Sequence, residues 1–233
     1  EKADPWARLD EILAAYADLI GRLAPLCSLI QIEEPVLCTD LLPEDAAGRF
    51  AAAYAALNAA ARPSSGGLML TTYFGSLTQH LPLAANSGCA ALHIDLVRAP
   101  GQLDHVLAAL PENMALSLGL VDGRNIWKTD YAQAAGLAQR AVSVLGSDRV
   151  LLGSSCSLLH SPVDLEEETE LPPAIRNRMA FAVQKCSELA DLAVIAHGNG
   201  AALLAANATQ MEDARQHEGT VLPAVRQRAA AVT

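Results

Sequence analysis

The chain has 233 residues, 52% of them hydrophobic, with a formal net charge of -10 and a pI near 5.0. This length allows one large domain or two small ones, and the acidic balance disfavours nucleic acid and anionic membranes as partners. Apolar runs stop short of the roughly 20 residues that a membrane-spanning helix needs, and no signal segment opens the chain, so we expect a cytoplasmic protein.

Five short apolar runs indicate the buried strands of a parallel sheet. They cover residues 28–35, 68–74, 91–97, 115–123 and 149–156. Stretches rich in alanine and leucine predict helices, which cover residues 9–23, 43–61, 100–110, 130–145 and 172–197. For the helix at 130–145, Thr129 is the expected N-terminal cap and Gly146 the expected end. This alternation predicts an α/β fold with parallel strands.

The predicted strands and helices divide the chain into two parts. Residues 1–198 are expected to form one domain, and residues 199–233 a helix that leads into a linker. The chain opens with Glu1 instead of methionine, which suggests a fragment or a trimmed product. Its five cysteines are far apart and include no C-x-x-C, so most are expected to be small core residues, with no disulfide scaffold.

Charged residues gather where the predicted strands end, the edge that binds ligands in parallel βα folds. Glu33 and Glu34 precede a proline, and only one of the two can face the centre of the sheet. That carboxylate could bind a substrate amine or form an ion pair. Asp95 could be catalytic or could form a salt bridge with Arg98.

The sequence VDGRNIW, residues 121–127, is the most site-like loop of the chain. Gly123 permits a sharp turn, and Asp122, Arg124, Asn125 and Trp127 place polar and aromatic groups on one loop. The aspartate and the arginine could equally serve only to brace that loop. We therefore take these four residues as candidates to brace a substrate cleft.

The sequence SSCSLLH, residues 154–160, places Cys156 and His160 four residues apart. A catalytic thiolate needs a base within hydrogen-bond reach, and a zinc site needs three or four ligands. No other histidine shows a paired spacing. The pair is therefore expected to support the core or a loop, with catalysis as the alternative.

Five of these segments together resemble the amino-terminal domain of cobalamin-independent methionine synthase. They are IQIEEPVLCTDL, LTTYFGSL, LHIDLVR, LGLVDGRNIWKTD and SSCSLLHSPVDLEEETELPPAIRNRMAFAVQK, in the family's order and spacing. The resemblance implies the later part of the family's amino-terminal barrel, a (β/α)8 barrel of the TIM type, with about five of its eight strands. It also implies a parent enzyme that transfers a methyl group from 5-methyltetrahydrofolate polyglutamate to homocysteine, giving methionine.

The resemblance implies that zinc and homocysteine bind in a second barrel outside this chain. At the positions matching that barrel's zinc ligands, this sequence has Thr72, Phe74, Asp95 and Cys156. One thiolate and one carboxylate cannot hold Zn²⁺. We therefore expect no catalytic residue, no metal and no cofactor in this chain, and no activity of the chain alone.

The expected partners are the missing barrel segments, the catalytic barrel, the folate donor and homocysteine. Two other functions stay open: an interaction module that completes its sheet with a partner chain, and a small enzyme resembling uroporphyrinogen decarboxylase that uses Asp95, Asp122 and Arg124. If the barrel is partial, its open sheet edges should also promote self-association.

Overall fold

A computed structural model describes residues 6–43, 45–62, 66–216 and 222–232. The chain forms two compact units. The first comprises residues 1–122 and 140–156, and the second comprises residues 123–139 and 157–233. The expected domain boundary near residue 198 stays a prediction, because a division of the chain by residue contacts does not test where a domain ends. None of the helices in the described part of the chain combines the length and apolarity needed to span a bilayer.

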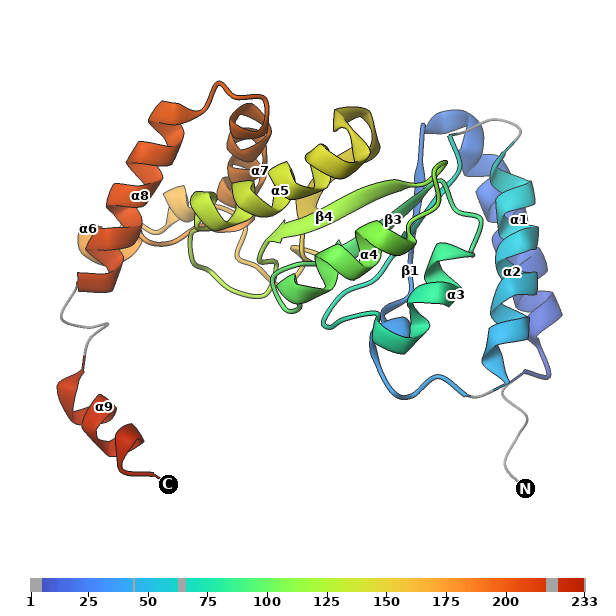
Figure 1. Ribbon diagram of the computed structural model, residues 1–233, viewed down its shortest axis with the longest axis horizontal. Coiled ribbons are helices and arrows are strands. Elements are labelled where there is room, and N and C mark those ends of the chain that lie inside the picture. Colours follow the sequence, from blue (N-terminus) through green and yellow to red (C-terminus); the bar gives the residue numbers. More distant parts are fainter. Residues whose placement is uncertain (1–5, 44, 63–65, 217–221, 233) are drawn as a thin grey trace. The chain divides into compact units, whose positions relative to one another are not determined.

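The first unit is built on a parallel sheet (Figure 1). Its strands, within the described residues, are β1 (Ile30–Glu33), β2 (Leu68–Thr71), β3 (Ala91–Asp95), β4 (Ala115–Val121) and β5 (Val150–Ser154). They lie side by side in chain order, and each pair is parallel. This is the order of strands in a segment of a (β/α) barrel, so the predicted fold class is confirmed.

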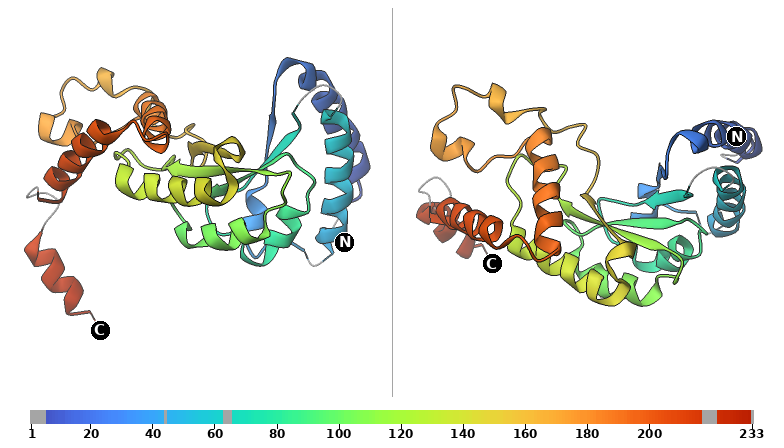
Figure 2. Two further views of the ribbon diagram at one scale, coloured as in Figure 1. Left: turned by 45° about the horizontal axis from the view of Figure 1, so that its top comes forward. Right: turned by 90° about the horizontal axis from the view of Figure 1, so that it is seen from above.

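Helices separate the strands of the first unit along the chain. These are α1 (Leu9–Leu23), α2 (Ala46–Ala61), α3 (Leu81–Ala85), α4 (Leu103–Ala109) and α5 (Tyr131–Leu145), whose later part belongs to this unit. Helices α3 and α4 lie against the same face of the sheet (Figures 1 and 2). The five-residue helix α3 was not predicted, and residue 44 of the expected helix at 43–61 lies outside the described residues.

The two faces of the sheet differ in chemistry. One face carries a continuous aliphatic layer, in which Leu70, Leu92 and Leu116 are neighbours and are fully buried. The opposite face carries Thr71, His93 and Ser117 at matching positions, all at most 5% exposed. Buried strand positions in barrels are usually aliphatic. Compared with that composition, the face that carries Thr71, His93 and Ser117 is unusually polar.

The edge strands β1 and β5 are more exposed than the strands between them. Ile30 and Ile32 are half-buried, and Leu151 is 41% exposed. Leu68 and Leu70, on β2 beside the edge strand β1, are fully buried.

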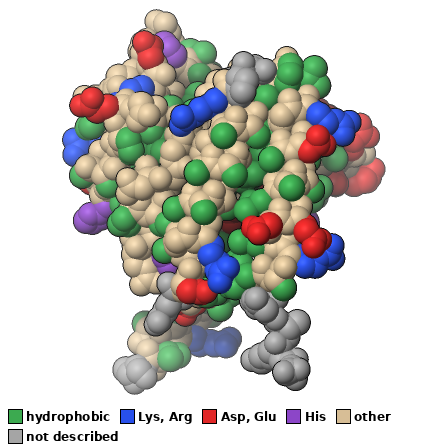
Figure 3. All heavy atoms as spheres, turned by 90° about the vertical axis from the view of Figure 1, so that its right-hand side faces the viewer, with side chains coloured by type: hydrophobic (Ala, Val, Ile, Leu, Met, Phe, Trp, Pro, Cys, Tyr) green, Lys and Arg blue, Asp and Glu red, His purple; other side chains and the backbone are tan. Residues whose placement is uncertain are grey.

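Helix α1 presents an exposed apolar stripe at helical spacing. Ile12, Tyr16, Leu19 and Leu23 are 50%, 52%, 49% and 39% exposed. Figure 3 looks onto the side where α1 and α2 lie, and hydrophobic side chains are interspersed there among charged ones. A stripe with this spacing fits a partner helix.

The second unit contains α6 (Pro173–Arg176), α7 (Ala182–Ala196), α8 (Ala201–Gln216) and α9 (Pro223–Ala230). The single helix expected at residues 172–197 was wrong, because residues 177–181 separate α6 from α7. In that break, Met179 forms an antiparallel bridge with Trp127. Leu165, Met179 and Phe181 form the small buried cluster beside it.

The first turn of α5 is capped by Asp130 and not by the expected Thr129. Asp130 Oδ1 accepts the N–H groups of Ala132 at 3.1 Å and Gln133 at 3.2 Å. The predicted end of this helix is confirmed, because Gly146 follows it with φ +81° and donates its N–H to Val142 O at 2.9 Å.

Candidate functional site at the carboxyl ends of the strands

Asp95, at the end of β3, holds together two segments of backbone. Its carboxylate accepts the N–H groups of Phe74 at 3.0 Å, Val97 at 3.0 Å and Arg98 at 2.9 Å. The residue is 1% exposed. A carboxylate that accepts three backbone N–H groups in a buried position has little capacity left for a substrate or a metal. Its geometry is that of a structural anchor.

The expected salt bridge between Asp95 and Arg98 was wrong. The Arg98 guanidinium lies 3.8 Å from the Asp122 carboxylate, and only its backbone N–H binds Asp95. The turn after β3 brings that N–H back onto Asp95, and the longer side chain reaches the end of β4. Arg98 therefore links the ends of β3 and β4, and Asp122, predicted as a bracing residue, is its ion-pair partner.

Phe74 takes the left-handed backbone conformation, with φ +71°. This region is unfavourable for an aromatic side chain, and the bond from its N–H to Asp95 helps to hold it there. The ring is 50% exposed and packs edge-on against Tyr73 at 4.6 Å between centroids. Two aromatic rings thus stand at the carboxyl end of β2.

Two tyrosines donate to the paired glutamates at the end of β1, Glu33 and Glu34. Tyr73 donates its hydroxyl to Glu33 at 2.7 Å, and Tyr54 donates to Glu34 at 3.1 Å. Burial, with help from the Glu33 carboxylate, raises the pKa of Tyr73 to about 12. Burial also raises the pKa of Glu34. Glu33 is exposed and Glu34 is half-buried, so the two side chains lie in different surroundings, as strand alternation predicts.

His93 was not singled out from the sequence, yet it sits within the polar face of the sheet. Its Nδ1 lies 2.8 Å from Ser117 Oγ, and burial lowers its pKa. A Cβ added to Gly119 would stand 3.0 Å from His93 Nε2 and 2.8 Å from Ser155 Cα. The glycine in LSLGL therefore leaves room for the ring, a signal that the sequence does carry.

The candidate loop of residues 123–129 is held by backbone bonds on both sides of Trp127. Lys128 donates its N–H to Arg178 O at 2.9 Å, and Ile126 O accepts the N–H of Ala180 at 2.8 Å. The Trp127 side chain is nevertheless 50% exposed. A fixed backbone that presents an exposed indole is a feature of binding loops.

Cys156 and His160 do not share one environment. Cys156 is 6% exposed at the end of the first unit, whereas His160 is exposed in the second. The six predicted bracing residues are likewise divided: Asp122 and Cys156 belong to the first unit, and Arg124, Asn125, Trp127 and His160 to the second. Their common role stays a prediction.

The positions that match the zinc ligands of the resemblance do not fit a metal. Thr72 donates its hydroxyl to His93 O at 2.8 Å, and Asp95 is committed to backbone N–H groups. Among the described residues, no three His, Cys, Asp or Glu side chains are grouped so that they could hold a metal ion.

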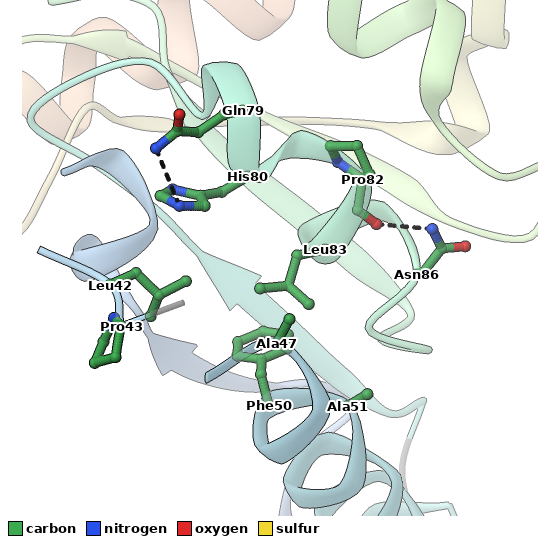
Figure 4. Close-up of a pocket in the computed structure, with 10 residues that line it drawn as sticks. All are labelled: Leu42, Pro43, Ala47, Phe50, Ala51, Gln79, His80, Pro82, Leu83 and Asn86. Carbon is green, nitrogen blue, oxygen red and sulfur yellow. Dashed lines mark hydrogen bonds between the residues drawn. The ribbon is translucent and has the colours of Figure 1, made fainter. Parts of the chain in front are cut away.

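A cavity of about 510 Å³ lies between α2 and α3 (Figure 4). Phe50, Leu83 and Pro43 make its wall mostly apolar, and His80 stands at one side with its Nδ1 2.9 Å from Leu37 O. None of the predicted site residues lines it. The cavity therefore supplies no argument for the chemistry at the carboxyl edge.

Comparison with known proteins shows the family. Residues 1–145 match the model of the cobalamin-independent synthase N-terminal domain. The chain belongs to this family. It is 46% identical to the 5-methyltetrahydropteroyltriglutamate–homocysteine methyltransferase of Syntrophotalea carbinolica, over 99% of this chain and 30% of that protein. It is 42% identical to the Caulobacter vibrioides enzyme of the same name, over 100% of this chain and 30% of that protein.

The chain spans about 30% of the length of these relatives. A probable enzyme of the same name from Schizosaccharomyces pombe is 40% identical over 98% of this chain, again with 30% of the relative covered. A crystal structure of a putative vitamin-B12 independent methionine synthase from Listeria monocytogenes matches 84% of this chain and 57% of that chain, with 14% identity and a TM-score of 0.49. The 46% identity over 99% of this chain to the Syntrophotalea carbinolica protein confirms the predicted family membership for nearly the whole chain.

Proposed function

We propose that this chain is part of a methyltransferase that moves the methyl group of 5-methyltetrahydropteroyltriglutamate to homocysteine without cobalamin, giving methionine. The observation that carries the proposal is the 46% identity over 99% of this chain to an enzyme of that name. Identity of this extent, spread over both compact units, supports a shared role for the whole segment.

Within that enzyme, the proposed role of this segment is to support the cleft that binds the folate donor. Asp122, Arg124, Asn125, Trp127, Cys156 and His160 are the residues proposed to brace it. The ion pair of Asp122 with Arg98 and the fixed backbone around Trp127 support this role, because both hold loops at strand ends. No residue of this chain is proposed to react with substrate.

The zinc implied by the resemblance belongs, in this proposal, to a second barrel outside the chain, and it would supply the Lewis acid that activates the homocysteine thiol. Thr72 and Asp95 support that assignment here, since both are committed to other bonds. The cytoplasm is the proposed compartment. Cys27 and Cys186 are exposed free thiols, which suit a reducing environment.

The test uses the purified whole protein that contains this segment. It should form methionine from homocysteine and 5-methyltetrahydropteroyltriglutamate with no cobalamin added. If correctly folded, zinc-loaded protein forms no methionine, the methyltransferase assignment is refuted.

The bracing role needs a separate measurement on the same protein. Arg124→Ala and Trp127→Ala should each raise the KM for the folate donor by about tenfold, with a smaller effect on the KM for homocysteine. Arg140→Ala is the matched control, because Arg140 forms an exposed ion pair with Asp104 at 2.9 Å and should change neither constant. Donor KM values equal to the wild type in both variants would argue against a cleft at this loop.

A further inference from the structure

Lys185 is a fully buried lysine in the second unit, with 0% of its surface exposed. It is the fourth residue of α7, in the first turn, where the helix dipole disfavours a positive charge. Burial of an ammonium group is costly in itself unless hydrogen bonds replace its water. A lysine kept at such a position must gain its stability from specific contacts.

Those contacts lie on the two sides of Trp127. The Lys185 ammonium donates to Asn125 Oδ1 at 3.1 Å and to Trp127 O at 3.1 Å. Asn125 Oδ1 also accepts the N–H of Trp127, at 3.0 Å. Lys185 therefore holds the carbonyl of Trp127 directly and holds its N–H through Asn125.

One turn further along α7, a second buried ionic residue holds the next part of the loop. Glu188 is 5% exposed and accepts both the N–H of Thr129 at 3.0 Å and its hydroxyl at 2.8 Å. Since residues three apart face the same side of a helix, Lys185 and Glu188 form one clamp on residues 125–129. Neither was singled out in the sequence, where both stand within an otherwise alanine-rich helix.

The clamp fixes the backbone of residues 125–129 but leaves the Trp127 side chain in contact with solvent. The Trp127 indole stays half exposed although its backbone N–H and C=O are both bonded within the unit. A surface loop that served only as a connection would not need a buried cation beneath it. Preorganisation of this kind is how a protein holds a binding loop in one geometry.

We propose that Lys185 is a positioning residue of the methyl-transfer enzyme. Through Asn125 and the Trp127 carbonyl, it holds the loop of residues 125–129 in the geometry that the folate donor meets. The effect on catalysis rests on the proposed function, whereas the effect on the loop does not. The two are therefore measured separately.

The experiment compares whole-protein variants by hydrogen exchange with mass spectrometry and by steady-state kinetics. Lys185→Met keeps the length of the side chain and removes its donors, and Lys185→Arg restores them. Arg140→Met removes a positive charge outside this loop, at the exposed ion pair that Arg140 forms with Asp104 at 2.9 Å.

Lys185→Met should speed amide exchange in residues 125–129 by about tenfold and should raise the donor KM by a similar factor. Lys185→Arg should recover most of both effects, and Arg140→Met should show neither. If Lys185 had a merely structural role, Lys185→Met would leave amide exchange in residues 125–129 and the donor KM unchanged. Global stability alone does not separate the two roles, because exchanging a buried charge for an apolar side chain often leaves it unchanged or improved.

Each outcome decides the inference. Unchanged exchange in residues 125–129 of Lys185→Met overturns it, and so does faster exchange with an unchanged donor KM. If Lys185→Met fails to fold, Asn125→Ala removes the shared acceptor and must raise the donor KM instead. A wild-type protein that forms no methionine would refute the proposed function, and the exchange data would still decide whether Lys185 holds the loop.

Discussion

The carboxylate of Asp95 accepts the backbone N–H of Phe74 at 3.0 Å, and so ties the end of β3 to the end of β2. The same carboxylate closes the turn that follows β3, through the N–H groups of Val97 and Arg98. One side chain thus fixes the left-handed conformation of Phe74 and the start of the Arg98 turn. The same carboxylate accepts the backbone N–H of Arg98, whose side chain forms an ion pair with Asp122, one of the residues proposed to brace the cleft.

Removal of the charge on Asp95 should loosen both strand ends. Asp95→Asn replaces one acceptor oxygen by an NH2 group that cannot accept, so buried N–H donors lose their partner. We expect destabilisation of roughly 2–4 kcal/mol, measured as the urea midpoint of this segment by pulse proteolysis of the whole protein. Asp104→Asn, at an exposed ion pair, should cost less than about 0.5 kcal/mol. Equal midpoints for the two variants would contradict an anchoring role.

His93 should make stability depend on pH in a definite direction. Burial lowers its pKa from 6.5, so the unfolded chain binds a proton that the folded chain resists. Its contribution is therefore present above pH 6.5 and is lost as the pH falls below that value, by up to about 1.4 kcal/mol per pH unit. His93→Gln should flatten the pH dependence of the urea midpoint between pH 6.5 and 5.

Glu34 and Glu188 have pKa values raised by burial and act in the opposite direction, so the difference between wild type and His93→Gln is the informative quantity. A pH profile that His93→Gln leaves unchanged would mean that His93 titrates alike in both states.

The isolated chain should associate through its apolar edges. The stripe of Ile12, Tyr16, Leu19 and Leu23 lies on α1, and Leu151 is exposed on the edge strand β5. Covering such side chains is favourable by roughly 25 cal/mol per Å². Light scattering at micromolar concentration should therefore show oligomers, and Leu19→Glu together with Ile12→Glu should reduce them. A stable, cooperatively folding monomer would contradict the expectation.

The isolated chain should bind no stoichiometric zinc and should form no methionine. Asp95 is committed to backbone N–H groups, and Thr72 and Phe74 offer no ligand to complete a site with Cys156. Elemental analysis of the purified chain should find far less than one zinc per chain, and incubation with both substrates should give no product. One tightly bound zinc per chain would overturn the first expectation, and methionine free of host enzyme the second.

Local pattern alone determined much of this fold. The helix at residues 9–23 and the five parallel strands were predictable because apolar periodicity and strand-length runs are properties of neighbouring residues. Gly146 ends α5 for an equally local reason, since glycine takes positive φ at low cost. The family resemblance also follows from sequence, because it rests on the order and spacing of short motifs.

Tertiary structure decided the features that depend on distant partners. The helix expected at 172–197 breaks because residues 178–180 exchange backbone bonds with residues 126–128, some fifty positions earlier, which no local pattern records. Thr129 gives up the cap of α5 to Asp130 because Glu188 binds its hydroxyl. Arg98 likewise forms its ion pair with Asp122, a residue 24 positions later in the sequence, and not with the nearby Asp95. The role of a buried charge such as Lys185 depends on tertiary structure, because folding removes its water and replaces it with specific acceptors, here Asn125 Oδ1 and Trp127 O.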